Sequence, residues 1–251
     1  MIKHISCVII AHNAQKTLPS VLDSLVDFSE VVIYSNNSSD KTDEIASSYP
    51  NVHLITGDFL GFGPTKNRAV SFAKNDWILS LDADEVLSSE FISELQHIEL
   101  CENNIYTINR INYYKTREIK HCWGNDTIVR VFNRKRTSFT DKKVHEKIIS
   151  DNLSTIALQG IVKHYPYSSI TEFITKLDRY SSIYAEDNMG KKRSSPTKAI
   201  FNALFSFIKT YFFKRGFLDG YAGLIIAFSH MATNFYKYIK LYEKNLELKR
   251  D

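Results

Sequence analysis

The chain of 251 residues is short of cysteine, of long apolar runs and of repeated or low-complexity sequence. Its three cysteines (Cys7, Cys101 and Cys122) have no metal-type spacing and cannot form an even disulfide framework, so we expect free thiols in a reducing cytosol. The apolar segment 5–11 lacks the basic lead, long apolar centre and cleavage site of a signal peptide, which favours a first strand. The apolar run 221–231 covers eleven residues, well below the ~20 that a bilayer-spanning helix needs.

Charge is nearly balanced overall but unevenly placed along the chain. Lysine and arginine number 32 against 28 acids, a net of +4, and the hydrophobic fraction of 43% is ordinary for a globular chain. Between residues 190 and 251 twelve basic residues face four acids, giving +8, so the first 189 residues carry −4. This asymmetry predicts that the C-terminal segment faces an anionic partner: a membrane surface, an anionic glycolipid or a nucleic acid.

Short apolar segments alternate with helical patterns over the first hundred residues. We expect strands at 5–10, 31–34, 52–55 and 77–81, with helices at 18–26, 42–49 and 65–74 between them. Strand–helix alternation of this kind predicts an α/β fold with a mostly parallel central sheet covered on both faces. Ligands of such sheets bind where the strands end at their carboxyl edge.

From residue 104 the pattern changes. Polar intervals separate expected strands at 105–111, 127–133 and 155–158, which predicts a mixed or antiparallel extension, and helices are expected at 170–187, 197–213 and 218–248. We therefore predict a domain over 1–168, with halves 1–103 and 104–168, followed by a basic, aromatic and helical C-terminal extension over 169–251.

Three carboxylates end the fourth apolar segment. Asp82, Asp84 and Glu85 directly follow 77–81, and burying unpaired carboxylates costs several kcal/mol each, so a cation or a dense set of donors is expected beside them. Two aspartates separated by one small residue can aim at the same space, and Mg²⁺ or Mn²⁺ prefers such oxygen ligands together with substrate phosphates. The triplet predicts a metal–diphosphate site at the edge of the sheet.

The segment 57–68 follows the third strand and contains three glycines, Lys66 and Arg68. The glycines are expected to let a ligand approach the backbone closely, and the two cations near a helix start are expected to meet phosphate oxygens. Together with the polar residues after the first two strands, four strand ends converge on one crevice.

These segments resemble family 2 glycosyltransferases with the GT-A fold, and within them the bacterial lipopolysaccharide core β-glucosyltransferases. The matching segments are 8–13, 38–42, 61–69, 76–85, 144–146, 164–167 and 216–220. The resemblance implies an inverting, metal-dependent hexosyltransferase that moves a hexose, glucose by this likeness, from a nucleotide diphosphate sugar such as a UDP-sugar. The acceptor implied is a lipid-linked saccharide such as the lipopolysaccharide or lipooligosaccharide core.

The resemblance also assigns donor-binding roles. Ala11 and Asn13 would line the nucleoside pocket, and Lys66 would approach the base or the diphosphate. Asp82 would face the ribose or the metal, and Asp84 would ligate the Mg²⁺ or Mn²⁺ that bridges the diphosphate.

Four further residues complete the predicted donor and metal site. Many family members have an acid at the end of the second strand, where this chain has Ser35 followed by Asn36, an amide that can still hydrogen-bond a base. Arg68 is predicted to assist Lys66. His164 is either a further metal ligand or diphosphate contact, or a satisfied structural histidine.

The acceptor hydroxyl needs a general base. Glu146 is the first candidate, Asp126 the second and Glu85 the third; the alternative for Glu146 is a surface ion pair with Lys142 or Lys147. Arg130 and Arg134, four residues apart in an expected strand, should share one face and meet either an acceptor anion or solvent.

The C-terminal helices interleave aromatic and basic residues, which predicts either an interfacial pair on a membrane or ordinary packing. The predicted location is cytoplasmic, peripheral to the inner face of the cytoplasmic membrane, with no nucleic-acid partner. A sugar nucleotidyltransferase is one alternative, although 11–15 lacks its glycine-rich loop; an anionic-polymer-binding module is another, although it leaves the acids unexplained. The oligomeric state stays open.

Overall fold

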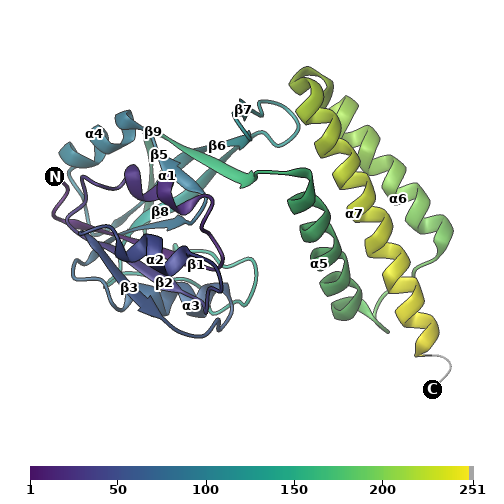
Figure 1. Cartoon of the computed structure of the whole chain (residues 1–251), viewed down its shortest axis with the longest axis horizontal. Coiled ribbons are helices and arrows are strands. Elements are labelled where there is room, and N and C mark those ends of the chain that lie inside the picture. Colours follow the sequence, from purple (N-terminus) through teal and green to yellow (C-terminus); the bar gives the residue numbers. More distant parts are fainter. Residues whose placement is uncertain (249–251) are drawn as a thin grey trace. The chain divides into compact units, whose positions relative to one another are not determined.

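The protein is described from a computed structural model over residues 1–248, and a mixed sheet of nine strands lies within that range (Figure 1). Four strands are parallel, and β1 pairs with both β2 and β4 while β2 pairs with β3. Their bounds are β1 (Ile5–Ala11), β2 (Val31–Ser35), β3 (Val52–Thr56) and β4 (Trp77–Asp82). The predicted first four strands are confirmed, and their carboxyl ends meet at one edge.

The remaining strands extend the sheet with antiparallel pairings on β4–β8, β8–β6 and β9–β5. They are β5 (Glu85–Leu87), β6 (Asn104–Tyr114), β8 (Asn125–Asn133) and β9 (Ser154–Tyr167). The mostly parallel order therefore holds for four strands, and the sheet as a whole is mixed. The short strand β5 was not predicted, because three residues carry too little pattern to detect.

Helices cover both faces of the parallel strands. Alternate β1 residues Cys7 and Ile9 join the core of α1, whereas Val8 packs with the residues of α3. Burial on both faces explains why these strands are continuously apolar. The helices of this unit are α1 (Leu18–Asp23), α2 (Thr42–Ser47), α3 (Phe62–Val70) and α4 (Ser89–His97), of which α4 was not predicted.

The chain divides into two compact units, residues 1–111 with 125–165 and residues 112–124 with 166–251. The sequence-based division at 168/169 differs from this one mainly by the excursion 112–124, which includes β7 (Arg117–Glu118). Residues 249–251 of the predicted extension lie outside the described part of the chain.

The second unit contains α5 (Ile170–Asn188), α6 (Pro196–Ile208) and α7 (Gly220–Glu247), and both α5 and α6 pack along α7. A π-helical turn, η1 (Lys209–Phe213), and a 3-10 turn, η2 (Gly216–Asp219), join α6 to α7. Within residues 1–248, no helix is both long and apolar enough to cross a membrane.

Asp219 fixes the start of α7 to the excursion 112–124. Its buried carboxylate accepts hydrogen bonds from the backbone N–H groups of Lys120, His121 and Cys122 at 2.9–3.1 Å. Burial, with Asp219 nearby, raises the pKa of the Cys122 thiol to about 12, so this cysteine stays protonated. Local packing thus accounts for Asp219 within the motif 216–220.

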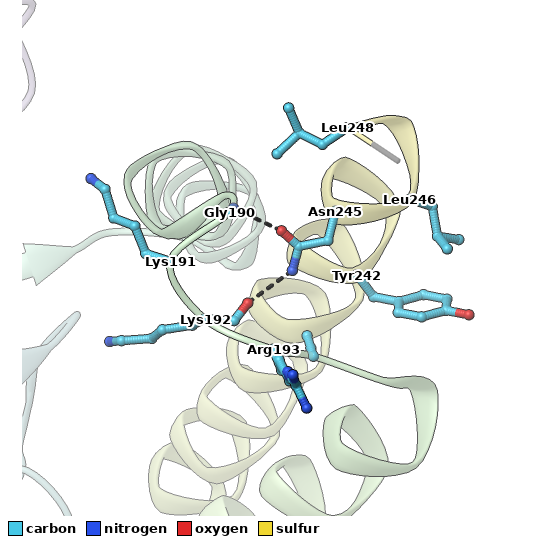
Figure 2. Close-up of a pocket in the computed structure, with 9 residues that line it drawn as sticks. Gly190, Lys191, Lys192, Arg193, Tyr242, Asn245, Leu246 and Leu248 are labelled. Carbon is cyan, nitrogen blue, oxygen red and sulfur yellow. Dashed lines mark hydrogen bonds between the residues drawn. The ribbon is translucent and has the colours of Figure 1, made fainter. Parts of the chain in front are cut away.

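The turn between α5 and α6 borders a pocket (Figure 2). Asn245 of α7 accepts from the backbone N–H of Gly190 and donates to the carbonyl of Lys192, which fixes this turn. None of the described residues that line the pocket is acidic. The described lining of this pocket therefore offers no carboxylate for metal or base chemistry.

Candidate functional site

The predicted acid triplet lies at a tight turn between β4 and β5. Asp82 is the last residue of β4 and Glu85 is the first of β5, with Ala83 and Asp84 between them. This reversal sends the three carboxylates to different partners. The triplet is therefore not one ligand cluster but the meeting point of several interactions.

Asp82 is held between two cations. Its Oδ1 lies 3.0 Å from Lys66 Nζ, and its Oδ2 lies 2.5 Å from Arg130 Nη2. Burial opposes ionisation, but the Arg130 guanidinium and the Lys66 ammonium together hold the pKa of Asp82 well below its usual range. Asp82 is therefore ionised at neutral pH, and both of its oxygens are engaged within the protein.

Glu85 has no exposed surface and is bound from three sides. Its Oε1 accepts from Arg130 at 2.5 Å and from Arg110 at 3.0 Å, and its Oε2 accepts from the backbone N–H of Asp82 at 3.0 Å. A side chain so enclosed cannot touch an acceptor, so the third candidate base is better described as a support for the 82–85 turn.

Glu85→Gln is expected to lower the free energy of unfolding by about 3 kcal/mol, because it removes the charge that compensates two buried or half-buried guanidinium groups. Urea unfolding measures the difference. Glu102→Gln, on an exposed turn, is the matched control and should change stability by less than about 0.5 kcal/mol. Equal stability of the two variants would contradict this description of the network.

Lys66 joins the acid turn to Glu146. Its Nζ lies 2.9 Å from Glu146 Oε1 and 3.0 Å from Asp82 Oδ1, and the residue is only 5% exposed. The surface pairing of Glu146 with Lys142 or Lys147 is not what the structure shows. The first candidate base instead lies beside the strand-end carboxylate, about sixty positions away in sequence.

Gly61 and Gly63, before Lys66, allow another part of the chain to pack closely on the start of α3. The prediction that a ligand approaches these two glycines is therefore wrong. A Cβ on Gly63 would lie 1.9 Å from the carbonyl oxygen of Thr140, and one on Gly61 (φ 103°) would lie 2.8 Å from Lys143 Cα. The backbone N–H groups of Phe62 and Gly63 donate to carbonyls of the same segment. Backbone of 140–143, not phosphate, therefore fills the start of α3.

Asn67 completes the docking of this segment. Its Nδ2 donates to the carbonyl of Phe139, and its Oδ1 accepts from the N–H of Phe139, both at 2.9 Å. This role of Asn67 was not predicted from the sequence, although an amide directly after Lys66 could have indicated it. Helix α3 thus positions both Lys66 and the segment that carries Glu146.

Asp84 lies beside His164, whereas the sequence had predicted that it shares a site with Asp82. Asp84 Oδ2 lies 3.6 Å from His164 Nε2, and the pairing of β5 with β9 places Glu85 opposite His164. Among residues 1–248 no group of three or more histidine, cysteine or acidic side chains could hold a metal ion. One carboxylate with one imidazole fits a divalent cation that takes its other ligands from water and diphosphate oxygens.

The second candidate base and the two predicted strand arginines all take part in ion pairs or hydrogen bonds within the protein. Asp126 lies 2.8 Å from Arg110, which also binds Glu85. Arg130 is buried on Asp82 and Glu85, whereas Arg134 donates to the backbone carbonyls of Val70 and Ala73 at and just after the end of α3. The predicted shared face is wrong, because β8 ends at residue 133 and Arg134 lies beyond it, and Arg130 faces protein carboxylates and not solvent.

The predicted nucleoside side lies at the ends of β1 and β2. The carbonyl of Ala11 accepts from the N–H of Asn36 at 2.8 Å, and Ser35 is fully buried. Asn13 has a left-handed backbone (φ 51°), and its Oδ1 accepts from the N–H of Ser39 at 2.8 Å. These bonds join the turns after the two strands into one rigid edge.

Asn36 carries an unsatisfied buried group at this edge. The residue is 7% exposed, and its side-chain Oδ1 is buried without a hydrogen-bond partner. Such an oxygen calls for a donor, and a ligand can supply one.

Arg68 was predicted to assist Lys66. Its side chain is exposed, and its guanidinium carbon lies 5.1 Å from the ring centroid of Phe72, so it takes no part in the network around Lys66.

The fold and this strand-end network agree with one enzyme class. The family model described as glycosyl transferase family 2 matches residues 6–159, more than half of the chain. The chain therefore belongs to glycosyl transferase family 2, and its fold is GT-A-like. The family and fold class expected from the sequence are both confirmed.

Individual relatives span nearly the whole chain. An uncharacterized glycosyltransferase of Rickettsia typhi is 29% identical over 261 residues, which cover 98% of this chain and 89% of that protein. The lipopolysaccharide core biosynthesis glycosyltransferase LpsC of Rhizobium meliloti is 25% identical over 252 residues, or 96% and 93% of the two chains. The solved structure of S. aureus TarS 1–349 in complex with UDP aligns with a TM-score of 0.48 at 13% identity, over 98% of this chain and 91% of that one.

Proposed function

We propose that the protein transfers a hexose from a UDP-sugar to a lipid-linked saccharide such as a lipopolysaccharide core, with inversion at the anomeric carbon. The observation that carries the proposal is the bridge formed by Lys66 between Asp82 and Glu146. It joins an ionised strand-end carboxylate, a buried cation and a candidate base in one site. Glucose is the hexose that the sequence resemblance favours.

The donor half of the reaction uses the edge formed by β1, β2 and β4. The unpaired Oδ1 of Asn36 can accept the ring N–H of a uracil, beside the rigid turns that hold Ala11 and Asn13. Asp82 would face the ribose through Oδ1, the oxygen that Lys66 releases when it moves to the diphosphate. Lys66 then meets the diphosphate and stabilises the negative charge that develops as the leaving group departs.

The acceptor half uses Glu146. In the structure Glu146 Oε1 lies 2.9 Å from Lys66 Nζ, so this carboxylate is paired with a cation. A diphosphate that draws Lys66 toward itself frees Glu146 to take the proton of the acceptor hydroxyl. Attack from the face opposite the leaving group inverts the anomeric centre, so an α-linked donor gives a β-linked product.

Asp84 and His164 would hold the divalent cation, Mg²⁺ or Mn²⁺. When bound, such a cation supplies positive charge that neutralises the departing diphosphate. Lys66 and Arg130 engage both oxygens of Asp82, so the cation is assigned to Asp84 and not to Asp82.

The acceptor is proposed to be an anionic, lipid-linked saccharide, which the +8 charge of residues 190–251 suits. LpsC, a relative with the same extent, carries a lipopolysaccharide core name. We place the enzyme in the cytoplasm, peripheral to the inner face of the cytoplasmic membrane.

A donor screen tests this function. The protein is incubated with UDP-, GDP- and TDP-hexoses and Mn²⁺ or Mg²⁺, with and without detergent-solubilised lipopolysaccharide core, and nucleoside diphosphate release is measured. We expect release to be fastest with UDP-glucose, to require a divalent cation and to rise with the acceptor, giving a β-linkage by NMR. No release with any UDP-hexose, or an α-linked product, would contradict the proposal.

A further inference from the structure

Helix α6 turns its large apolar side chains outward and its small ones inward. Ala199 and Ala203 are buried, at 0% and 5% exposure, on the side that packs along α7. Five large residues are 43–68% exposed: Ile200, Phe201, Leu204, Phe205 and Ile208. Their spacing puts them on one helix face. A bundle surrounded by water normally has the opposite arrangement, whereas small residues at helix contacts and large ones outside are typical of helices in contact with lipid.

The exposed face continues across the two turns into α7. Phe213 is 72% and Tyr221 64% exposed. Phe207 contacts the rings of Phe212 and Phe228 with centroids 6.5 and 5.0 Å away. Aromatic contacts thus connect α6, η1 and α7 into one surface, which we call the apolar face (the exposed residues of 200–228).

The exposed charges on the segment that carries the apolar face have one sign. Lys209, Lys214 and Arg215 are exposed at its border. Asp219 is the single acid between residues 190 and 242, and it is buried on three backbone N–H groups. A second copy of the chain would bring like charges together at this face. An anionic surface with an apolar interior satisfies both features.

We propose that the apolar face inserts into the interfacial layer of an anionic phospholipid bilayer, with Lys209 and Lys214 on the lipid headgroups. The helices lie at the interface and do not span it, since within residues 1–248 none is long and apolar enough to cross. This inference rests on the proposed function for its purpose, because a lipid-linked acceptor is presented on such a surface.

Sedimentation of the full-length protein with sugar-free vesicles tests the inference separately from catalysis. The probes are phosphatidylcholine vesicles with and without about 30 mol% phosphatidylglycerol. We expect binding to the anionic vesicles, about tenfold weaker for the double variant F201S/F205S and several-fold weaker for K209Q/K214Q. Both double variants change exposed residues only, so they should fold, which circular dichroism checks.

The matched control is I174S/Y180S on α5, whose residues are also exposed, at 60% and 57%, but lie among the acids of that helix. It should bind vesicles like the wild type. No binding by the wild type, equal binding by F201S/F205S, or equal binding to neutral vesicles would overturn the proposal. Self-association that F201S/F205S abolishes, without vesicle binding, would also overturn it and assign the face to a second copy. UDP release in the donor screen is scored independently, so either proposal can fail alone.

Discussion

Glu146→Gln is expected to reduce sugar transfer about 10³-fold or more while donor binding is retained. Glutamine keeps the shape of the side chain but cannot accept the proton of the acceptor hydroxyl. The carboxylate lies 2.9 Å from Lys66, so the substitution also removes one partner of that cation, and Lys66 keeps Asp82 as the other. Turnover with acceptor and thermal stabilisation by UDP with Mn²⁺ are the two measurements.

The control for this prediction is Asp141→Asn, an exposed acid on the same segment, which should transfer at the wild-type rate. A general base and a structural partner of Lys66 give different results. If Glu146 only holds Lys66, both stabilisation by UDP and turnover should fall together. Near-normal turnover of Glu146→Gln would show that the base is elsewhere, and Asp126→Asn would then be the next variant to measure.

Asp84→Asn is expected to abolish the cation-dependent part of donor binding and to lower turnover by about 10²- to 10³-fold, because charge on the departing diphosphate is then poorly compensated. Asp84 is the carboxylate of the turn that has no arginine or lysine partner among the ion pairs of residues 1–248, and its neighbour is His164 at 3.6 Å. Calorimetry with UDP, with and without Mn²⁺, measures the effect.

The exposed Asp151→Asn variant serves as the control and should bind UDP with Mn²⁺ like the wild type. His164→Gln should weaken the same Mn²⁺-dependent binding by a smaller factor, since it removes a neutral ligand and not a charge. Unchanged Mn²⁺ dependence in Asp84→Asn would contradict the assignment of Asp84 and would redirect the search to Asp82.

The parallel strands were predictable because strands that are buried on both faces have continuous apolar sequences, as in 5–10 and 77–81. The strand-end positions of Asp82 and Asp84 followed from the same pattern. Short elements such as β5 were not predictable, since their pairing with β9 is a long-range contact. The pairing of Asp84 with His164 was not predictable from sequence spacing either, because it depends on the same long-range contact.

The glycines at 61 and 63 show how a correct observation can lead to a wrong partner. Glycine there does mark a close approach, but the approaching atoms belong to Thr140 and Lys143, not to a ligand. Sequence spacing carries no information on which of many backbone segments fills such a gap. The interior role of Arg130 was hidden likewise, because its charge indicates a partner but not whether that partner is a ligand or Glu85.

The sequence by itself determined that the three carboxylates after 77–81 lie at the end of a strand, because the local apolar pattern defines that strand. It also determined that cations lie near them, because burying unpaired charge is costly. Tertiary structure alone decided which cations these are. Lys66, Arg110 and Arg130 come from one helix and two antiparallel strands, and the docking of 140–143 on α3 brings Glu146 within 2.9 Å of Lys66. Short-range patterns encode secondary structure, whereas long-range packing selects each charge's partner.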